Sequence, residues 1–340
     1  MAKPDGKESE DSENNKESIP PIDNNGINES IDNNEPKDQD DQVPVKEYDL
    51  NEFDDAYQAF VKDNLKEDRI GATIAKNIIN LKNKFKLDKY KIIFLFDEYT
   101  TLSSSEADRI YEALADFKCD RDILLILNNL GGQIESAYLI SQTCKKSTLQ
   151  KFVVAVPRKA KSAATLLALG ADEIHMGLMS ELGPIDPQIN NLPALGLGNS
   201  LEYIAKIVTK YPDSSSMFSQ YLSSKLELNV LGYFERVSES ATQYAERLLG
   251  ERVFPNDEKA KSIAEKLVYH YKDHSFVIDI VEAKTLLGEG IIKENTNEYD
   301  FANAVYSLFN NINFFFRHVR QKKFTYVGSI SSGLRTYTIQ

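Results

Sequence analysis

The sequence has few cysteines and no long apolar run. The first feature argues against a disulfide framework, and the second argues against a transmembrane helix. Only two cysteines, Cys119 and Cys144, occur in 340 residues, and their spacing is not that of a metal site. So few cysteines indicate a reduced, cytoplasmic protein without a disulfide framework. No segment at the N-terminus resembles a signal peptide, and no apolar run approaches the length of a transmembrane helix.

Positive charge is also scarce, with 40 Lys and Arg against 52 Asp and Glu. The lack of an extended basic stripe argues against a nucleic-acid substrate. The first fifty residues carry fifteen acidic side chains against five lysines, and few large apolar residues precede Val43. We therefore predict a disordered acidic tail over residues 1–47, which either solubilises the chain or binds a basic partner.

Short apolar runs alternate with helical patterns in the next part of the chain. The runs are Lys91–Phe96, Asp122–Leu127 and Phe152–Val156. This alternation predicts an α/β fold with a mostly parallel sheet. Prolines and glycines predict a long irregular loop over residues 180–199, and helical patterns dominate from Leu201 onward. We expect one folded domain over residues 48–295 and a helical C-terminal extension over residues 296–340.

Two strand-to-helix junctions carry the residues with the clearest chemistry. Gly131 and Gly132 follow one apolar run, and Ser162 follows the next. Paired glycines permit unusual backbone dihedrals, and the start of a helix presents free N–H donors. Because ligands bind beyond the carboxyl ends of parallel strands, a serine nucleophile and an oxyanion hole are expected there together.

The stretch from Ile123 to Pro187 resembles Clp-type proteases and signal peptide peptidase A, and in particular the serine dehydrogenase proteinase family. The similar segments read LLILNNLGGQIESAYLIS and VVAVPRKAKSAATLLALGADEIHMGLMSELGPIDPQI. The resemblance covers roughly residues 90–290. It implies a ClpP/crotonase-like fold of repeated β-β-α units wound as a superhelix, with a mostly helical C-terminal half. It also implies a serine peptidase that acts on peptides or proteins without a cofactor or metal, and that forms a homo-oligomer.

The resemblance assigns roles residue by residue. Ser162 matches the nucleophile, Gly131 and Gly132 match the backbone of the oxyanion hole, and the N–H of Ala163 is the second donor. The family usually has a proline before the paired glycines, where this chain has Leu130.

The general base is not assigned by the resemblance. Asp186 stands where Clp-type proteases have a histidine, and Arg236 stands where signal peptide peptidases have a lysine. Arginine stays protonated and cannot act as a base. Lys225 is the preferred candidate because a buried lysine can have a lowered pKa. Lys206 is a second lysine nearby in sequence, and Asp186 is a residue that lines the site.

Structural roles compete with several of these assignments. Ser162 is also a suitable helix N-cap. His270 and His274 are four residues apart, but no third metal ligand is evident, so we interpret them as polar residues near a helix end. His175 is interpreted as a structural residue at the end of a strand.

The leading hypothesis is a cytoplasmic serine peptidase of the signal peptide peptidase A type, with an acyl-enzyme at Ser162. One alternative is a ClpP-like scaffold or adaptor that has lost its chemistry with the base. Another is a crotonase-like acyl-CoA enzyme, which uses a similar oxyanion hole for a thioester enolate.

Overall fold

The computed structural model describes residues 46–115, 120–189, 192–226, 228–252, 257–271 and 273–339. The chain divides into two units, Met1–Lys46 and Glu47–Gln340, and the helices and strands described below belong to the second. The predicted acidic tail, except for residues 46–47, and Cys119 lie outside the described residues.

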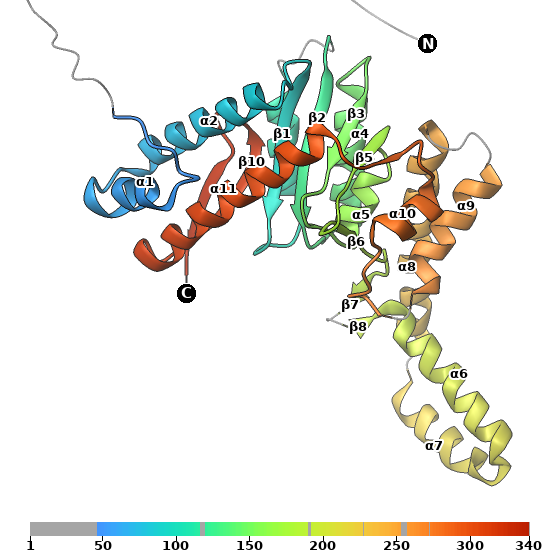
Figure 1. Ribbon diagram of the computed structural model, residues 1–340. Helices are drawn as coiled ribbons and strands as arrows, with labels where there is room; N and C mark the ends of the chain where they lie inside the picture. Colours follow the sequence, from blue (N-terminus) through green and yellow to red (C-terminus); the bar gives the residue numbers. More distant parts are fainter. Residues whose placement is uncertain are drawn as a thin grey trace, which may run out of the picture. The chain divides into compact units, whose positions relative to one another are not determined.

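Five parallel strands form the centre of the main sheet (Figure 1). In spatial order they are β1 (Tyr90–Asp97), β2 (Asp122–Asn129), β3 (Phe152–Ala155), β5 (Glu173–His175) and β9 (Ile292–Lys293). The side chains of β1 alternate between two cores, with Ile93 and Leu95 on one face and Ile92 and Phe94 on the other. Both faces are therefore covered, which explains why these strands are apolar throughout.

Different helices cover the two faces of the sheet. On one face lie α1 (Phe53–Tyr57), the π-helix η1 (Gln58–Lys62), α2 (Glu67–Lys84) and α11 (Asn297–Val319). On the other lie α3 (Ser104–Leu114), α4 (Ile134–Lys146) and α5 (Ala163–Ala168). A capping box begins α3: the carboxylate of Glu106 accepts the N–H of Ser103 at 2.8 Å, and Oγ of Ser103 accepts the N–H of Ser105 at 3.3 Å.

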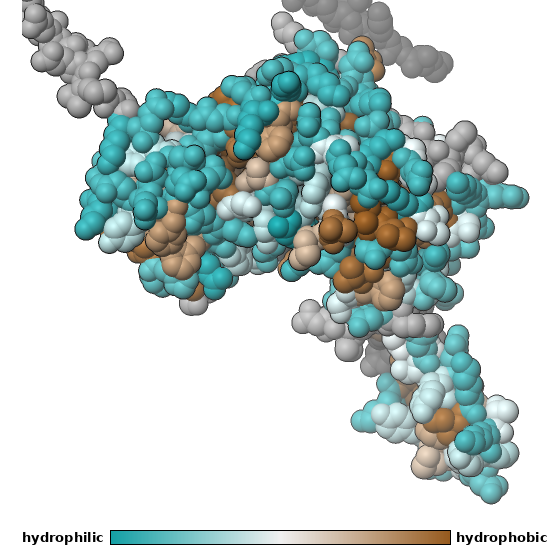
Figure 2. Space-filling model, in the orientation of Figure 1, coloured by the Kyte–Doolittle hydropathy of each residue, from teal (hydrophilic) through white to brown (hydrophobic). Residues whose placement is uncertain are grey.

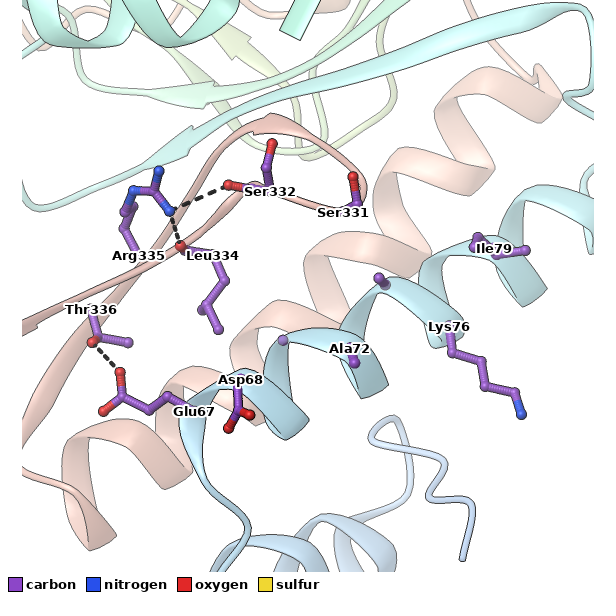
Figure 3. A pocket seen from close by; sticks show the side chains of 12 residues that line it. Glu67, Asp68, Ala72, Lys76, Ile79, Ser331, Ser332, Leu334, Arg335 and Thr336 are labelled. Atoms are coloured by element: carbon purple, nitrogen blue, oxygen red, sulfur yellow. Dashed lines mark hydrogen bonds between the residues drawn. The ribbon is translucent and has the colours of Figure 1, made fainter. Parts of the chain in front are cut away.

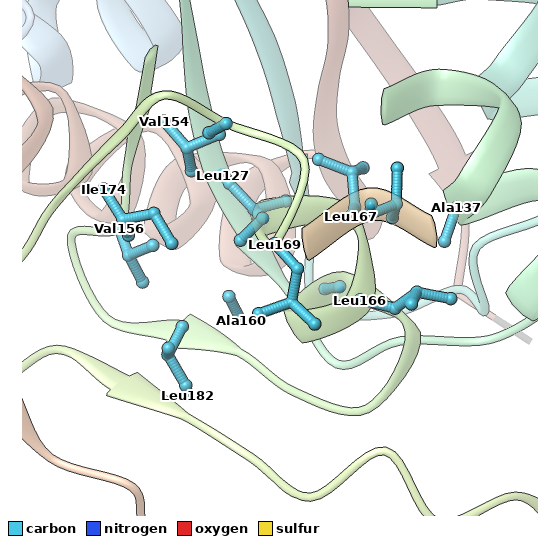
Figure 4. Packing of buried hydrophobic residues seen from close by; sticks show 14 of the residues in the cluster. Leu127, Ala137, Val154, Val156, Ala160, Leu166, Leu167, Leu169, Ile174 and Leu182 are labelled. Atoms are coloured by element: carbon cyan, nitrogen blue, oxygen red, sulfur yellow. The ribbon is translucent and has the colours of Figure 1, made fainter. Parts of the chain in front are cut away.

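The short helix α5 lies at the centre of one core, and Figure 4 shows its packing. Leu166, Leu167 and Leu169 contact the same cluster as Leu127 of β2 and Val154 of β3, and all five are fully or almost fully buried. This packing fixes the helix, and with it the residue just before its first turn.

Four short strands also follow β3 in the chain: β4 (Lys159–Ala160), β6 (Glu181–Leu182), β7 (Gln188–Ile189) and β8 (Leu192–Pro193). Helices follow: α6 (Ala194–Lys210), the 3-10 helix η2 (Pro212–Ser214), α7 (Ser215–Lys225), α8 (Leu228–Arg252), α9 (Asp257–Glu265), the π-helix η3 (Lys266–His270) and α10 (Ile280–Leu287). The expected irregular loop over 180–199 thus contains three strands and the start of α6.

The C-terminal region is more than the predicted helical extension. After α11 the chain forms β10 (Lys322–Ser329) and β11 (Leu334–Thr338), and β10 pairs antiparallel with β1. The residues from Phe324 to Gly328 are buried on both faces of β10, with Phe324 and Tyr326 in the core that contains α11 and Val327 in the other core. β10 and β11 therefore belong to the main sheet, and α11 covers one of its faces.

A hollow of about 780 Å³ lies between α2 and the β10–β11 hairpin (Figure 3). Glu67 holds the two elements together, since its carboxylate accepts hydrogen bonds from Lys322 and, at 2.8 Å, from Thr336. Serines and carboxylates line this hollow, but none of its described lining residues is a histidine. We therefore place the active site elsewhere. Among the helices of the described residues, none has the length and apolarity needed to cross a membrane.

Candidate active site

Ser162 stands between β4 and α5 in a strained backbone conformation. Its φ of 50° and ψ of −120° lie outside the regions favoured by residues with a side chain. Strain of this kind is typical of a nucleophile at a sharp strand-to-helix turn. The side chain makes no N-cap hydrogen bond, so the structure does not use this serine as a helix cap.

A cavity of about 680 Å³, called here the Ser162 pocket, opens beside this serine. Its walls are the loop after β1 at residues 98–101, the turn and start of α4 at residues 130–135, and the segment around Pro187. Tyr233 and Val237 of α8 and the side chain of His274 complete the lining.

The paired glycines bring a tight turn against the backbone of the nucleophile. A Cβ on Gly131 would lie 2.7 Å from the carbonyl oxygen of Lys161 and 2.8 Å from Cβ of Ser162. A Cβ on Gly132 would lie 2.3 Å from the carbonyl oxygen of Leu102. Both residues have positive φ, 100° and 154°, so glycine is required at each position by contact and by conformation.

The hydrogen bonds of this turn distinguish the two glycines. The N–H of Gly131 donates to Oδ1 of Asn129 at 2.8 Å, so it is already used. Leu102 bonds the main chain on either side of Gly132 and leaves the N–H of Gly132 without a partner among the described residues. The N–H of Ala163 belongs to the first turn of α5, where no intrahelical acceptor exists. The two donors available for an oxyanion are therefore those of Gly132 and Ala163, and Gly131 provides the close approach.

Asp186 and His274 meet at the same pocket. Nδ1 of His274 lies 2.5 Å from Oδ1 of Asp186, and only 5% of Asp186 is exposed. With Nδ1 bonded to a carboxylate, Nε2 of the imidazole is the nitrogen left for another partner. Asp186 is not itself among the lining residues of the pocket, and it contacts the pocket through His274, which the sequence interpretation treats as a polar residue near a helix end.

Main-chain pairing brings these two residues together from distant parts of the chain. Leu182 and Ile278 exchange both backbone hydrogen bonds, at 2.9 and 3.1 Å. The N–H of Ile185 donates to the carbonyl of Leu267 at 2.9 Å. This isolated bridge places the segment of His274 opposite that of Asp186.

Lys161, the residue before the nucleophile, is buried and fully used. Its Nζ lies 2.6 Å from Oε2 of Glu181 and donates to the carbonyl oxygens of Leu182 at 3.3 Å and Phe276 at 3.1 Å. An ammonium has three donors, and here each has an acceptor. This lysine therefore connects the nucleophile segment to the two segments that carry Asp186 and His274.

The structure does not bring the preferred lysine to the pocket. Lys225 is exposed in the last turn of α7, and Lys206 is exposed on α6. Neither lines the Ser162 pocket. Arg236 is exposed too, and donates to the carbonyl of Gly232 on its own helix.

His175, which the sequence interpretation treats as structural, does not line the Ser162 pocket. It is 3% exposed at the end of β5, and its Nδ1 lies 2.8 Å from Oγ1 of Thr296. Burial lowers the pKa of this imidazole, and the nearby carboxylates of Glu298 and Glu173 oppose the shift only in part. In the part of the chain that the structure describes, no group of three or more His, Cys, Asp or Glu side chains is arranged to hold a metal ion.

Comparison with known proteins decides the family. A model of the ClpP-like SDH-type serine proteinases matches residues 90–328, which is more than half of the chain. The chain belongs to this family. The predicted family and the ClpP-like α/β fold are thereby confirmed. The match extends beyond residue 290, through α11 and most of β10, in agreement with the place of these elements in the main sheet.

Two curated relatives come from Methanocaldococcus jannaschii and are described as uncharacterized proteins. MJ0137 is 27% identical over 194 residues, which is 57% of this chain and 62% of the relative. MJ1495 is 28% identical over 199 residues, which is 58% of this chain and 61% of the relative. The chain thus spans about three fifths of the length of the curated relatives it matches.

Solved structures of two proteases are also similar. A serine-to-alanine mutant of the 1510-N membrane-bound stomatin-specific protease is 15% identical, with a TM-score of 0.39, over 66% of this chain and 84% of the other. ClpP1 from Listeria monocytogenes is 15% identical, with a TM-score of 0.35, over 64% of this chain and 98% of the other.

Proposed function

We propose that this protein is a serine peptidase in which Ser162 is the nucleophile, His274 the general base and Asp186 the residue that orients the base. The observation that carries the proposal is the contact of His274 with Asp186 at the pocket that Ser162 lines. A base held by a buried carboxylate beside a strained serine is the arrangement required for nucleophilic attack.

The residues act in sequence on a peptide carbonyl. Oγ of Ser162 attacks the carbonyl carbon and Nε2 of His274 takes the hydroxyl proton, while the N–H groups of Gly132 and Ala163 hold the oxyanion. The imidazolium then protonates the leaving amine, and an acyl-enzyme remains on Ser162. Water then attacks the acyl carbon while Nε2 of His274 takes its proton. The imidazolium gives that proton to Oγ of Ser162 as the ester bond breaks, which releases the carboxylic acid and restores both residues.

This proposal differs from the expected signal peptide peptidase A type, which would use a lysine base. The geometry favours His274 because Lys225 is exposed and Lys161 already has three acceptors. A base at His274 also removes the main reason for the alternative of a ClpP-like scaffold without chemistry, since that alternative depended on the lack of a base. The acyl-CoA alternative requires no nucleophilic serine, and the strained backbone of Ser162 argues against it.

Two further expectations belong to this proposal. We keep the cytoplasmic location as a prediction from cysteine usage. We also propose a homo-oligomer, supported by exposed apolar side chains that gather near β6 and α10 on the face seen in Figure 2. Leu178 and Met179 precede β6, Phe276 and Val277 precede α10, and Val281 lies on α10; all five are exposed. Exposed patches of this kind are typical of protein–protein contacts.

A fluorophosphonate probe tests the proposed function on the full-length protein. The phosphonate should attach to Ser162, as located by mass spectrometry, and Ser162→Ala should remove the adduct. Ser103→Ala serves as a matched control, because Ser103 caps α3 outside the pocket. Absence of labelling in folded, assembled protein would contradict the proposal, and a coenzyme A thermal shift in that protein would favour the acyl-CoA alternative.

A further inference from the structure

The Ser162 pocket contains two carboxylates and no lysine or arginine among its described lining residues. The carboxylates belong to Glu98, in the loop after β1, and Glu135, in the first turn of α4. Neither makes an ion pair with a described residue. Glu98 is half-buried, whereas Glu135 is exposed. A partly shielded, unpaired carboxylate attracts a cationic group more strongly than one on an open surface, so we expect Glu98 to contribute more than Glu135.

Glu98 is fixed in place by a buried amide. Its Oε1 accepts a hydrogen bond of 2.9 Å from Nδ2 of Asn128, a fully buried residue near the end of β2. Oδ1 of the same amide accepts the N–H of Lys159 at 3.0 Å, which sets the orientation of the side chain. The carboxylate is therefore positioned before substrate binds, and its second oxygen has no partner among the described residues.

The end of β2 also contacts the segment that carries the nucleophile. Asn129 follows Asn128, and its carbonyl accepts the N–H of Lys161 at 3.1 Å, one residue before Ser162. Glu98 and Lys161, the residue before the nucleophile, are thus bonded to consecutive residues of β2. Glu135 lies three residues after Gly132, one of the two oxyanion donors, so the two carboxylates belong to two different walls of the pocket.

We propose that the Ser162 pocket selects peptides with lysine or arginine next to the scissile bond, with Glu98 as the principal specificity residue and Glu135 as the second. This inference rests on the proposed peptidase function and names its substrate class. A substrate with a neutral side chain next to the scissile bond would leave the carboxylate of Glu98 without a cation. The selectivity for lysine or arginine therefore comes from the charge of the substrate side chain rather than from its length.

The test uses two quenched-fluorescence peptides that differ only by lysine or norleucine on either side of one bond, with the cleavage site read by mass spectrometry. Norleucine keeps the aliphatic chain and removes the ammonium. We expect kcat/KM for the lysine peptide to exceed that for the norleucine peptide about tenfold, as one desolvated charge pair provides. Glu98→Gln should reduce this ratio to near one and Glu135→Gln should reduce it about threefold. Glu112→Gln on α3, outside the pocket, makes the same charge change and should keep the ratio.

Fluorophosphonate labelling of the same preparations separates the two proposals. Protein that labels at Ser162 but cleaves both peptides equally would overturn the inferred specificity and leave the peptidase function intact. A lysine preference that persists in the Glu98→Gln, Glu135→Gln double variant would overturn it as well. Protein that neither labels nor cleaves would overturn the proposed function and this inference with it.

Discussion

The two halves of the candidate site differ in how the chain builds them. The nucleophile half consists of the Gly131–Gly132 turn and Ser162, at two neighbouring strand-to-helix junctions about thirty residues apart. The base half consists of Asp186 and His274, which are 88 residues apart and meet through backbone pairing between irregular segments. The first half depends on local sequence, whereas the second depends on the completed fold.

The two halves are connected by a small set of buried contacts. Lys161 bonds Glu181 and the carbonyls of Leu182 and Phe276. The hydroxyl of Thr165, on α5, donates to the carbonyl of Ala160 at 2.6 Å and accepts the N–H of Gly183 at 2.9 Å. Changes in these contacts should therefore affect the base half without removing the nucleophile.

Loss of the carboxylate that orients the base should have the largest effect. Asp186→Asn keeps the shape of the side chain but places an amide against Nδ1 of His274. The amide no longer holds the imidazole in its productive tautomer. We expect kcat to fall by about 10² or more with KM changed little. Asp273→Asn, next to His274 but bonded to Ser275, is the matched control and should stay within about twofold. Equal loss in both variants would argue against an orienting role for Asp186.

A methyl group at the glycine turn should damage the other half nearly as much. Gly132→Ala would place a Cβ 2.3 Å from the carbonyl oxygen of Leu102, at a φ of 154°, so the turn must shift. Displacement of an oxyanion donor should lower kcat about 10²-fold. Gly250→Ala, where a Cβ meets nothing within 4 Å, should not reduce activity. Full activity of Gly132→Ala would remove this N–H from the mechanism.

The sequence predicted the secondary structure around the nucleophile half well because its signals are local. An apolar strand, paired glycines and a serine before a small-residue helix all fall between Asp122 and Ala168, and β1, β2, β3 and α5 lie where these patterns indicate. The catalytic roles of these residues stay a prediction. His274 could not be found in this way, because nothing near it in sequence shows that Ile278 pairs with Leu182. The one available signal was an aspartate, Asp186, at a position where related proteases have a histidine.

The C-terminal region shows the same limit. The helical pattern predicts α11, but the expected helical extension over residues 296–340 does not include β10, because its partner strand β1 lies more than two hundred residues earlier. The sequence also predicts irregular structure where α6 begins, because the glycines and prolines of residues 180–199 favour loops.

Removal of the connecting ammonium should affect stability and activity together. Lys161→Met leaves the carboxylate of Glu181 and two carbonyls without their donor in a largely buried place. We expect a loss of about 3 kcal/mol in the free energy of unfolding and roughly a tenfold loss in kcat. Lys145→Met breaks a contact with Glu251, whose side chain is 42% exposed, and serves as the control. It should lower stability less and leave kcat unchanged, as measured by denaturant unfolding and peptide cleavage.

The smallest effect concerns His175, which lies outside the site. Burial lowers its pKa in the folded protein below the ordinary value of about 6.5. The unfolded chain therefore binds the proton first, and stability should fall as pH drops below about 6.5. His175→Gln removes this titration, so its unfolding free energy should depend less on pH between about 6.5 and 5. An unchanged slope would show that other groups determine acid sensitivity.

The most direct test of the central claim compares two possible bases by peptide cleavage, with His274→Ala beside Lys225→Met in assembled, folded protein. We predict that His274→Ala lowers kcat/KM by about 10³-fold and slows fluorophosphonate labelling of Ser162, while Lys225→Met stays within about twofold. An inactive Lys225→Met beside an active His274→Ala would contradict the account, and would assign the proton transfer to the lysine.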